Sequence, residues 1–116
     1  MAHLNLLVLR ARDIDATRDF YTLLGMRFVR EQHGRGPVHY ATQLGDLVLE
    51  TYPGEEPSKG ARLGLYIENM KHLLARFPDE TVLSKPEMTT HGWKMLLVDP
   101  DERKVEVSFT ETGWDE

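Results

Sequence analysis

Residues 4–25 read LNLLVLRARDIDATRDFYTLLG, a short apolar run that gives way to a helical pattern. The apolar run Leu4–Leu9 has no helical punctuation, which is typical of a buried strand. Asp13 can cap a helix, because its carboxylate accepts hydrogen bonds from the first free amides, and Phe20 and Leu24 then recur at helical spacing. Gly25 supplies the left-handed residue on which helices often end. The segment therefore predicts a strand followed by a helix.

The rest of the chain repeats this order after a further set of strands. In the first half we expect extended segments at 26–32, 38–44 and 47–52, with Gly45-Asp46 as a two-residue hairpin turn. In the second half we expect a strand at 62–67, a helix capped by Asn69 and ended by Pro78, and strands at 81–84, 93–98 and 104–109. Residues 53–60 have the composition of a linker.

Three landmarks recur at one offset of 56 residues, which indicates an internal duplication. They are Leu6 and Arg62 in the first strands, Asp13 and Asn69 at the helix caps, and Glu50 and Glu106 in the last strands. The prediction is an α+β fold with two β-α-β-β-β modules, at about residues 4–52 and 61–110, within one domain spanning 1–116. The modules should form a cupped mixed sheet with the helices on its outer face.

Composition excludes several functional classes. The chain has 116 residues, 14 basic and 19 acidic side chains and no cysteine. A formal charge of −5 without a basic cluster argues against nucleic-acid binding. Absence of cysteine excludes disulfides, zinc knuckles and a cysteine nucleophile, and it favours an intracellular setting. No apolar run approaches the roughly 18 residues of a membrane span, so we expect a cytoplasmic protein without a membrane partner.

Alternation along the strands predicts a polar face opposite the helices. In strand 47–52 the leucines should face the helices and leave Glu50 on the other side. The Gly45-Asp46 turn pairs Ala41 with Glu50, which places the neighbouring odd-numbered residues of that strand on the same face. The polar residues expected to share this face are His39, Gln43, Glu50 and Tyr52.

The second module should present Arg62, Tyr66 and Glu106 on the corresponding face. Such a face is either solvated or part of a ligand pocket, and both readings are open from alternation alone. The tyrosines favour a pocket with apolar walls and a few fixed polar groups.

Six short motifs in fixed order carry a family resemblance: LRARD at 9–13, FY at 20–21, LGM at 24–26, LVLE at 47–50, DPD at 99–101 and VEV at 105–107. Together they resemble the vicinal-oxygen-chelate superfamily, which includes glyoxalase I, bleomycin resistance proteins and extradiol dioxygenases. The resemblance extends from about Leu4 to Phe109. Glu102 stands where the family usually has glycine, so the turn there is expected to differ locally.

The resemblance implies that metal-dependent members place ligands on the first and last strands of each module. Those positions are Leu6, Glu50, Arg62 and Glu106 in this chain. Leu6 has no lone pair, and Arg62 is a permanent cation that would repel a metal. We therefore expect no bound metal, with Arg62 bridging Glu50 and Glu106 through charge-assisted hydrogen bonds.

Two functional hypotheses follow. The first is a metal-free binding module in which Arg62, Glu106, Tyr52, Tyr66 and Gln43 hold a small anionic or carbonyl-bearing molecule. The second is an enzyme: a lyase or dioxygenase whose divalent metal is held by Glu50, Glu106 and a recruited His39, or a metal-free isomerase with Glu50 or His39 as base. His33 and His91 lie in loops and are expected to be exposed rather than functional. The resemblance also implies a homodimer.

Overall fold

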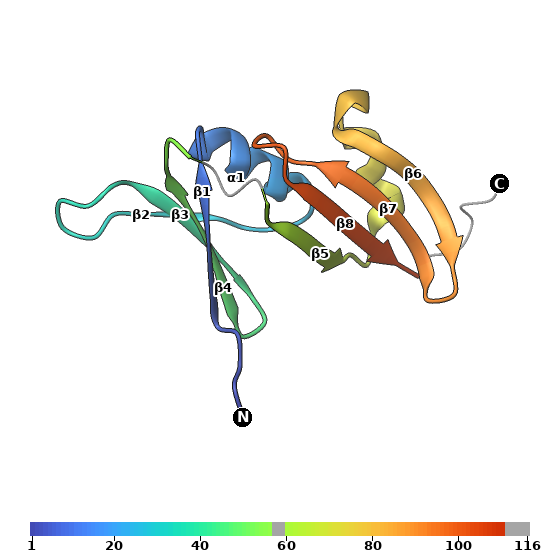
Figure 1. Ribbon diagram of the computed structural model, residues 1–116, viewed down its shortest axis with the longest axis horizontal. Coiled ribbons are helices and arrows are strands. Elements are labelled where there is room, and N and C mark those ends of the chain that lie inside the picture. Colours follow the sequence, from blue (N-terminus) through green and yellow to red (C-terminus); the bar gives the residue numbers. More distant parts are fainter. Residues whose placement is uncertain (57–59, 111–116) are drawn as a thin grey trace. The chain divides into compact units, whose positions relative to one another are not determined.

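The computed structural model describes residues 1–56 and 60–110, and the chain divides into two compact units, Met1–Ser58 and Lys59–Glu116. Each unit contains a four-stranded mixed sheet and few helices, which confirms the α+β class (Figure 1). The elements of the first unit are β1 (Leu6–Ala11), α1 (Ile14–Leu23), β2 (Val29–Glu31), β3 (His39–Leu44) and β4 (Leu47–Pro53).

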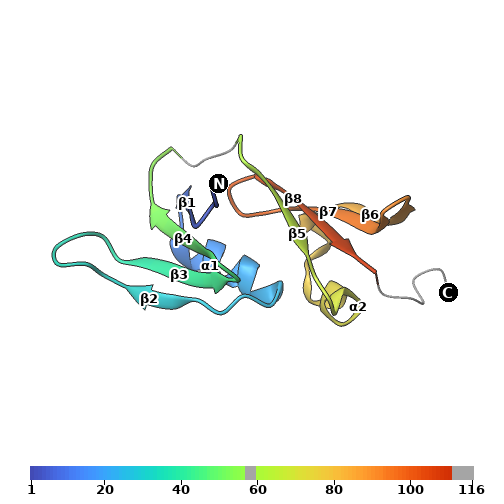
Figure 2. The ribbon, with the colours of Figure 1, turned by 90° about the horizontal axis from the view of Figure 1, so that it is seen from below.

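The second unit repeats the order with shorter helices. Its elements are β5 (Arg62–Tyr66), α2 (Met70–Leu73), the 3-10 turns Leu74–Arg76 and Asp79–Thr81, β6 (Val82–Thr89), β7 (Gly92–Val98) and β8 (Lys104–Phe109). Figure 2 shows the strands of each unit from a second direction. Within the described residues, no helix is both long enough and apolar enough to cross a membrane.

The two sheets have the same topology, and their parallel strand pairs have the same register. Their strand orders are β1-β4-β3-β2 and β5-β8-β7-β6, and in each sheet the first strand runs parallel to the last. Val8 pairs with Glu50 in the first sheet, and Gly64 pairs with Glu106 in the second, so an offset of 56 residues maps one pair onto the other. This shared register supports the duplication predicted from the sequence.

Helix α1 begins and ends where the sequence predicts. Asp13 accepts hydrogen bonds at Oδ1 from the amides of Asp15 (3.0 Å) and Ala16 (3.1 Å). Gly25 follows the helix with φ +96°, a conformation that a side chain would strain. The helix packs against β3 and β4 and buries Phe20 and Tyr21.

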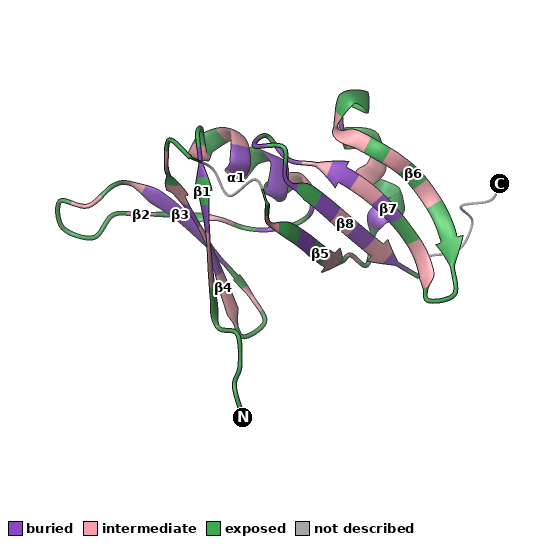
Figure 3. Cartoon of the chain, in the orientation of Figure 1, coloured by how far each residue is buried: buried purple, intermediate pink, exposed green. Residues whose placement is uncertain are grey.

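Apolar side chains alternate toward the helix side of each sheet, as expected. Leu9 and Leu49 are buried in the first unit, and Val105, Val107 and Phe109 are buried in the second. Figure 3 shows the resulting alternation of buried and less buried residues along β8. The opposite faces therefore carry the polar residues of both sheets.

Several predicted boundaries were wrong. The first strand runs from Leu6 to Ala11, because pairing with β4 begins at Leu6, and Leu4 is exposed. Within 26–32, only Val29–Glu31 pairs as a strand. The strand expected at 81–84 is β6, which extends to Thr89 despite Pro86, since a proline is tolerated on an edge strand beside a register shift.

The second helix also differs from its prediction. Asn69 stands at the N-cap, but its side chain makes no capping bond, and its φ of −114° and ψ of 44° are not the extended values that a cap requires. The α-helix lasts only four residues and continues as a 3-10 turn. In the expected linker, Pro53 belongs to β4, and residues 57–59 lie outside the described part.

Candidate functional site

Three strands of the first unit bring four polar side chains together on the face opposite α1. Glu31 of β2 pairs with His39 of β3, and the β3–β4 hairpin pairs Ala41 with Glu50. Tyr52 then lies beside His39, with ring centroids 4.0 Å apart and planes at 11°. The hairpin register predicted from the sequence is confirmed, and it places His39, Glu50 and Tyr52 in one cluster.

His39 is the centre of this cluster and is only 1% exposed. Its Nδ1 lies 3.2 Å from the carbonyl oxygen of Pro37, which can only accept, so Nδ1 carries a proton and donates it. Its Nε2 lies 3.1 Å from Oε1 of Glu31 and 3.4 Å from Oε2 of Glu50. One ring nitrogen is thus fixed by the backbone, and the other is directed at two carboxylates.

Tyr52 completes the surroundings of that nitrogen. Its hydroxyl lies 3.2 Å from Nε2 of His39, and the guanidinium of Arg10 lies 5.2 Å from its ring centroid. Burial raises the pKa of the Tyr52 hydroxyl, and the charges of Glu50 and Glu31 raise it further. Tyr52 therefore stays protonated at neutral pH and can donate a hydrogen bond to Nε2.

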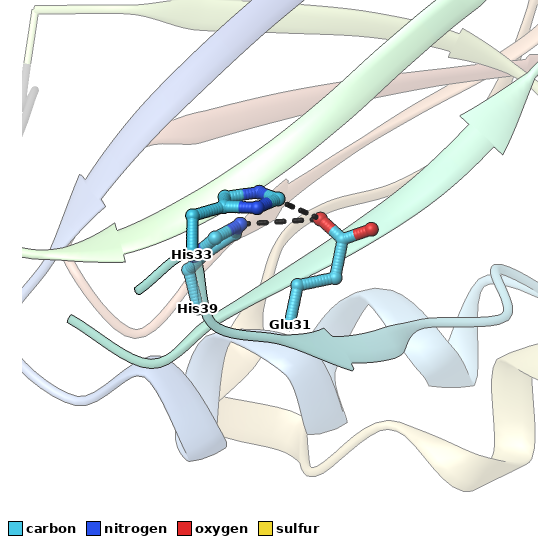
Figure 4. A group of neighbouring side chains, drawn as sticks. All are labelled: Glu31, His33 and His39. Atoms are coloured by element: carbon cyan, nitrogen blue, oxygen red, sulfur yellow. Dashed lines mark hydrogen bonds and ion pairs between the residues drawn. The ribbon is translucent and has the colours of Figure 1, made fainter. Parts of the chain in front are cut away.

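His33 joins the cluster from the loop after β2, where an exposed residue without a functional role was expected. Its Nε2 lies 4.0 Å from the same Glu31 oxygen that His39 approaches (Figure 4), and its side chain is 74% exposed. Glu31 was missed as well. The available signal was the spacing of Glu31 and His33, which are two residues apart; the pairing of Glu31 with His39 is seen only in the structure.

A groove of about 550 Å³ adjoins this cluster within the first unit. Its lining residues are Gly25, Met26, Arg27, Val29, Glu31, Ala41, Thr42, Gln43, Leu44 and Val48. Gln43 thus lines the groove as well as sharing the predicted face, and its side-chain nitrogen donates to the carbonyl of Gly45 over 2.6 Å. The volume is within the range of small-molecule sites, roughly 300–1,000 Å³.

The second unit carries a different group on the corresponding face. Arg62 Nη2 donates to Oε1 of Glu106 over 2.9 Å, and Lys94 Nζ lies 3.4 Å from Oε2. The hydrogen bond from Arg62 holds the pKa of the Glu106 carboxyl below its ordinary value, and Lys94 lowers it further. These residues border a cavity of about 190 Å³ that also includes Ser84 and Thr89.

Tyr66 of β5 is 56% exposed, and its hydroxyl is hydrogen-bonded to Oγ1 of Thr110 over 2.8 Å. It does not line the 190 Å³ cavity. The predicted Arg62–Glu106 contact is present, whereas a bridge from Arg62 to Glu50 of the other unit stays a prediction.

Comparison with known proteins identifies the family. The sequence model of the glyoxalase/bleomycin resistance protein/dioxygenase superfamily matches residues 3–107. The chain belongs to this superfamily. A search of curated protein sequences found no match.

Solved structures of this superfamily's fold resemble the chain over nearly its whole length. An integron cassette protein from V. cholerae is 25% identical, covers 96% of this chain and 97% of its own, and has a TM-score of 0.67. TnmS3, an antibiotic-binding protein from Streptomyces sp. CB03234, is 20% identical; the match covers 96% of this chain and 98% of TnmS3, with a TM-score of 0.73. A bleomycin resistance determinant encoded on the transposon Tn5 is 22% identical; the match covers 96% of this chain and 100% of the determinant, with a TM-score of 0.64.

The positions that superfamily members use for metal do not fit a metal in this chain. Leu6 offers no donor atom and is half exposed. Arg62 is a cation, and it and Lys94 engage the two carboxylate oxygens of Glu106. Of the four positions only Glu50 combines a donor oxygen with a neighbouring imidazole, so the set as a whole cannot supply the three or four donors that such an ion needs.

Proposed function

We propose that the protein binds a small anionic or carbonyl-bearing molecule without a metal at the superfamily's usual position, and that Arg62 anchors this molecule. The observation that carries the proposal is the Arg62–Glu106 pair, which puts a cation where a metal ligand would otherwise stand. A guanidinium has five N–H donors, of which Glu106 accepts one at 2.9 Å. The side chain is 54% exposed, so its other donors can reach a ligand.

Two structural neighbours support binding without turnover as the mode of action. One is described as an antibiotic-binding protein and the other as a bleomycin resistance determinant. We propose that this chain likewise sequesters a small molecule, with Glu106 and Tyr66 of the same unit as Arg62 among its contacts. A cytoplasmic location and a homodimer stay predictions.

Titration with pyruvate, a small carbonyl-bearing anion, and with acetate, a simple carboxylate, tests the proposal. Nitrogen-15 NMR should show saturable shifts of the Arg62 side-chain signal. Arg62→Leu should remove the binding, whereas Arg76→Leu, which changes an exposed arginine of the same unit, should not. Absence of saturable shifts with both probes, or equal binding by both variants, contradicts the role of Arg62.

A second candidate is catalysis of the glyoxalase type at His39 and Glu50. The 3.4 Å separation of their Nε2 and Oε2 atoms favours it, because a carboxylate next to an imidazole can remove and relay a proton. Glu50 is only 15% exposed, which limits competition from water. In a metal-free enzyme Glu50 or His39 is the base, whereas in a metal-dependent lyase or dioxygenase both are ligands.

Hydrogen–deuterium exchange at the carbon next to a carbonyl tests this second candidate. Hydroxyacetone in D₂O should exchange its carbon-bound protons faster with the protein than in buffer, and Glu50→Gln should abolish the gain. Glu56→Gln, an exposed change in the same unit, serves as the control. If EDTA removes the acceleration of exchange, the reaction belongs to a metal-dependent enzyme. If the acceleration persists in EDTA, the reaction belongs to the metal-free base.

A further inference from the structure

We infer that the first unit binds one divalent transition-metal ion through Glu31, His33 and His39. The donor atoms are one carboxylate oxygen and one nitrogen from each imidazole, and all three lie within 4.8 Å of one another. Figure 4 shows both rings directed at the same oxygen of Glu31. The proposal goes beyond ligand binding at Arg62 and is independent of it.

The separations of the donor atoms suit a single small ion. Two ligands about 2.0–2.1 Å from a zinc ion at the tetrahedral angle are about 3.4 Å apart. Glu31 Oε1 is 3.1 Å from His39 Nε2 and 4.0 Å from His33 Nε2, which brackets this value. The His33 side chain is 74% exposed, so it can rotate to shorten the longer distance when an ion binds.

The hydrogen bonding of His39 prepares its Nε2 to be a ligand. Metal-bound histidines generally donate their other ring N–H to a carbonyl or carboxylate, which fixes the ring and the tautomer. Here Nδ1 donates to the carbonyl of Pro37, and stacking on Tyr52 holds the ring plane. The ring is also almost fully buried, so a metal would meet an oriented nitrogen.

The charges around Nε2 give a reason for a cation at this point. With the proton on Nδ1, the lone pair of Nε2 faces the Tyr52 hydroxyl at 3.2 Å, which can donate to it. It also faces Glu31 Oε1 at 3.1 Å and Glu50 Oε2 at 3.4 Å, and ionised carboxylates offer only further lone pairs. A bound cation converts this repulsion into attraction for all of these atoms.

The donor set indicates the class of metal. Two imidazoles and one carboxylate suit zinc, cobalt or nickel, whereas calcium and magnesium prefer oxygen ligands alone. Three protein ligands leave a coordination position open for water or a small molecule. The site lies on β2, β3 and the loop between them, and it shares none of its three ligands with the four positions that the family resemblance implied. It therefore departs from the expectation of a metal-free protein.

Calorimetric titration of the untagged 116-residue chain with ZnCl₂, followed by CoCl₂ for visible spectroscopy, tests the inference. We expect one ion per chain and a cobalt spectrum of low-symmetry, four-coordinate type. Glu31→Gln and His33→Ala should each weaken zinc binding by roughly tenfold or more, since the loss even of an outer partner costs about 10–100-fold. Both side chains are at least partly exposed, so these variants should retain their far-UV circular dichroism.

His91→Ala is the matched control, because His91 is an exposed loop histidine of the second unit. It should bind zinc like the parent. Nitrogen-15 spectra should show zinc shifting a ring nitrogen of both His33 and His39, while Nδ1 of His39 keeps its proton. Absence of saturable binding at one ion per chain, or equal weakening by His33→Ala and His91→Ala, would overturn the proposal.

Discussion

The guanidinium of Arg62 and the carboxylate of Glu106 form a hydrogen-bonded ion pair across β5 and β8, with a 2.9 Å separation between Nη2 and Oε1. Gly64 is the cross-strand partner of Glu106, so Arg62 reaches it diagonally from two residues earlier on β5. A Cβ at position 64 would meet no other atom within 4 Å, so the contact does not depend on glycine there.

Arg62→Leu should raise the pKa of Glu106 toward its ordinary value, because the largest stabilisation of the carboxylate is lost while Lys94 remains. A group with a depressed native pKa stabilises the fold above its unfolded pKa and loses that contribution as the pH falls through the native value. The variant should therefore melt below the parent at pH 7, and the difference should shrink in acid. Carbon-13 NMR titration of the Glu106 carboxyl and melting curves at pH 7 and pH 3 measure this. Arg76→Leu should change neither, and a parent-like melting curve for Arg62→Leu at pH 7 would refute the prediction.

Asp13→Ala should lower the free energy of unfolding by about 1 kcal/mol, the usual contribution of an N-cap. Its carboxylate accepts two amide hydrogen bonds that alanine cannot replace. Asn69→Ala is the matched change in the second unit and should cost only about a few tenths of a kcal/mol, since Asn69 makes no side-chain capping bond. Urea titrations of both variants compare the two caps. Equal losses in the free energy of unfolding would show that the Asn69 side chain makes a capping bond in solution.

Glu102→Gly should increase stability by about 0.5–1 kcal/mol. Glu102 has φ +66°, in the left-handed region that costs a residue with a side chain roughly 1 kcal/mol. The turn keeps its backbone bond from the Glu102 amide to the Asp99 carbonyl, at 3.0 Å, in either form. Glu102→Ala keeps a side chain at this position and should bring little gain. A thermal melt in which glycine is no better than alanine would exclude backbone strain at this turn.

Arg103→Met should destabilise the second unit by about 3–5 kcal/mol, because removing one partner of a buried ion pair leaves an uncompensated charge. The Arg103 side chain is fully buried, and its Nη1 lies 2.8 Å from Oδ2 of Asp99 and 3.7 Å from Oδ2 of Asp101. Lys104→Met alters the exposed neighbour and should change stability by less than about 0.5 kcal/mol. Denaturant unfolding followed by Trp93 fluorescence reports on this unit, and similar losses for the two variants would contradict the role of the pair.

Sedimentation velocity tests the predicted homodimer. The chain should sediment as a dimer at tens of micromolar, a range in which weak associations dissociate. Val29 and Leu6 are 62% and 48% exposed on the polar face of the first sheet, and a partner would cover such side chains. A monomer at these concentrations would count against the prediction, and dilution to about 1 µM separates a tight dimer from a weak one.

Much of the fold could be predicted because its signals are local. Asp13, Gly25 and the Gly45-Asp46 turn each determine the backbone around them, and alternation then assigns the faces of β4 and β8. Strand ends were less predictable, since pairing decides them: Leu4 is as apolar as Leu9 but has no partner on β4. The helix after Asn69 was predicted, but its shortness was not, because helical spacing does not reveal the backbone angles of Asn69.

The candidate site was predictable where a tight turn sets the register. The two-residue turn between β3 and β4 places His39 near Glu50 and Tyr52, and these contacts are present. Glu31 and His33 were missed because the loop between β2 and β3 is too long to belong to a defined turn type. Without that register, nothing in the sequence placed Glu31 opposite His39.

The common register of the parallel pairs β1–β4 and β5–β8 makes each unit a reference for the other. Leu6 and Arg62 occupy the same backbone environment with opposite chemistry, and so do Val8 and Gly64. Exchanging residues between such positions would vary the chemistry while the scaffold stays constant. Introducing histidine at positions 6 and 62 together would test whether the residues that the family resemblance implies as ligands can bind a metal here. Reciprocal exchange of leucine and arginine would test whether function depends on the unit or on the side chain.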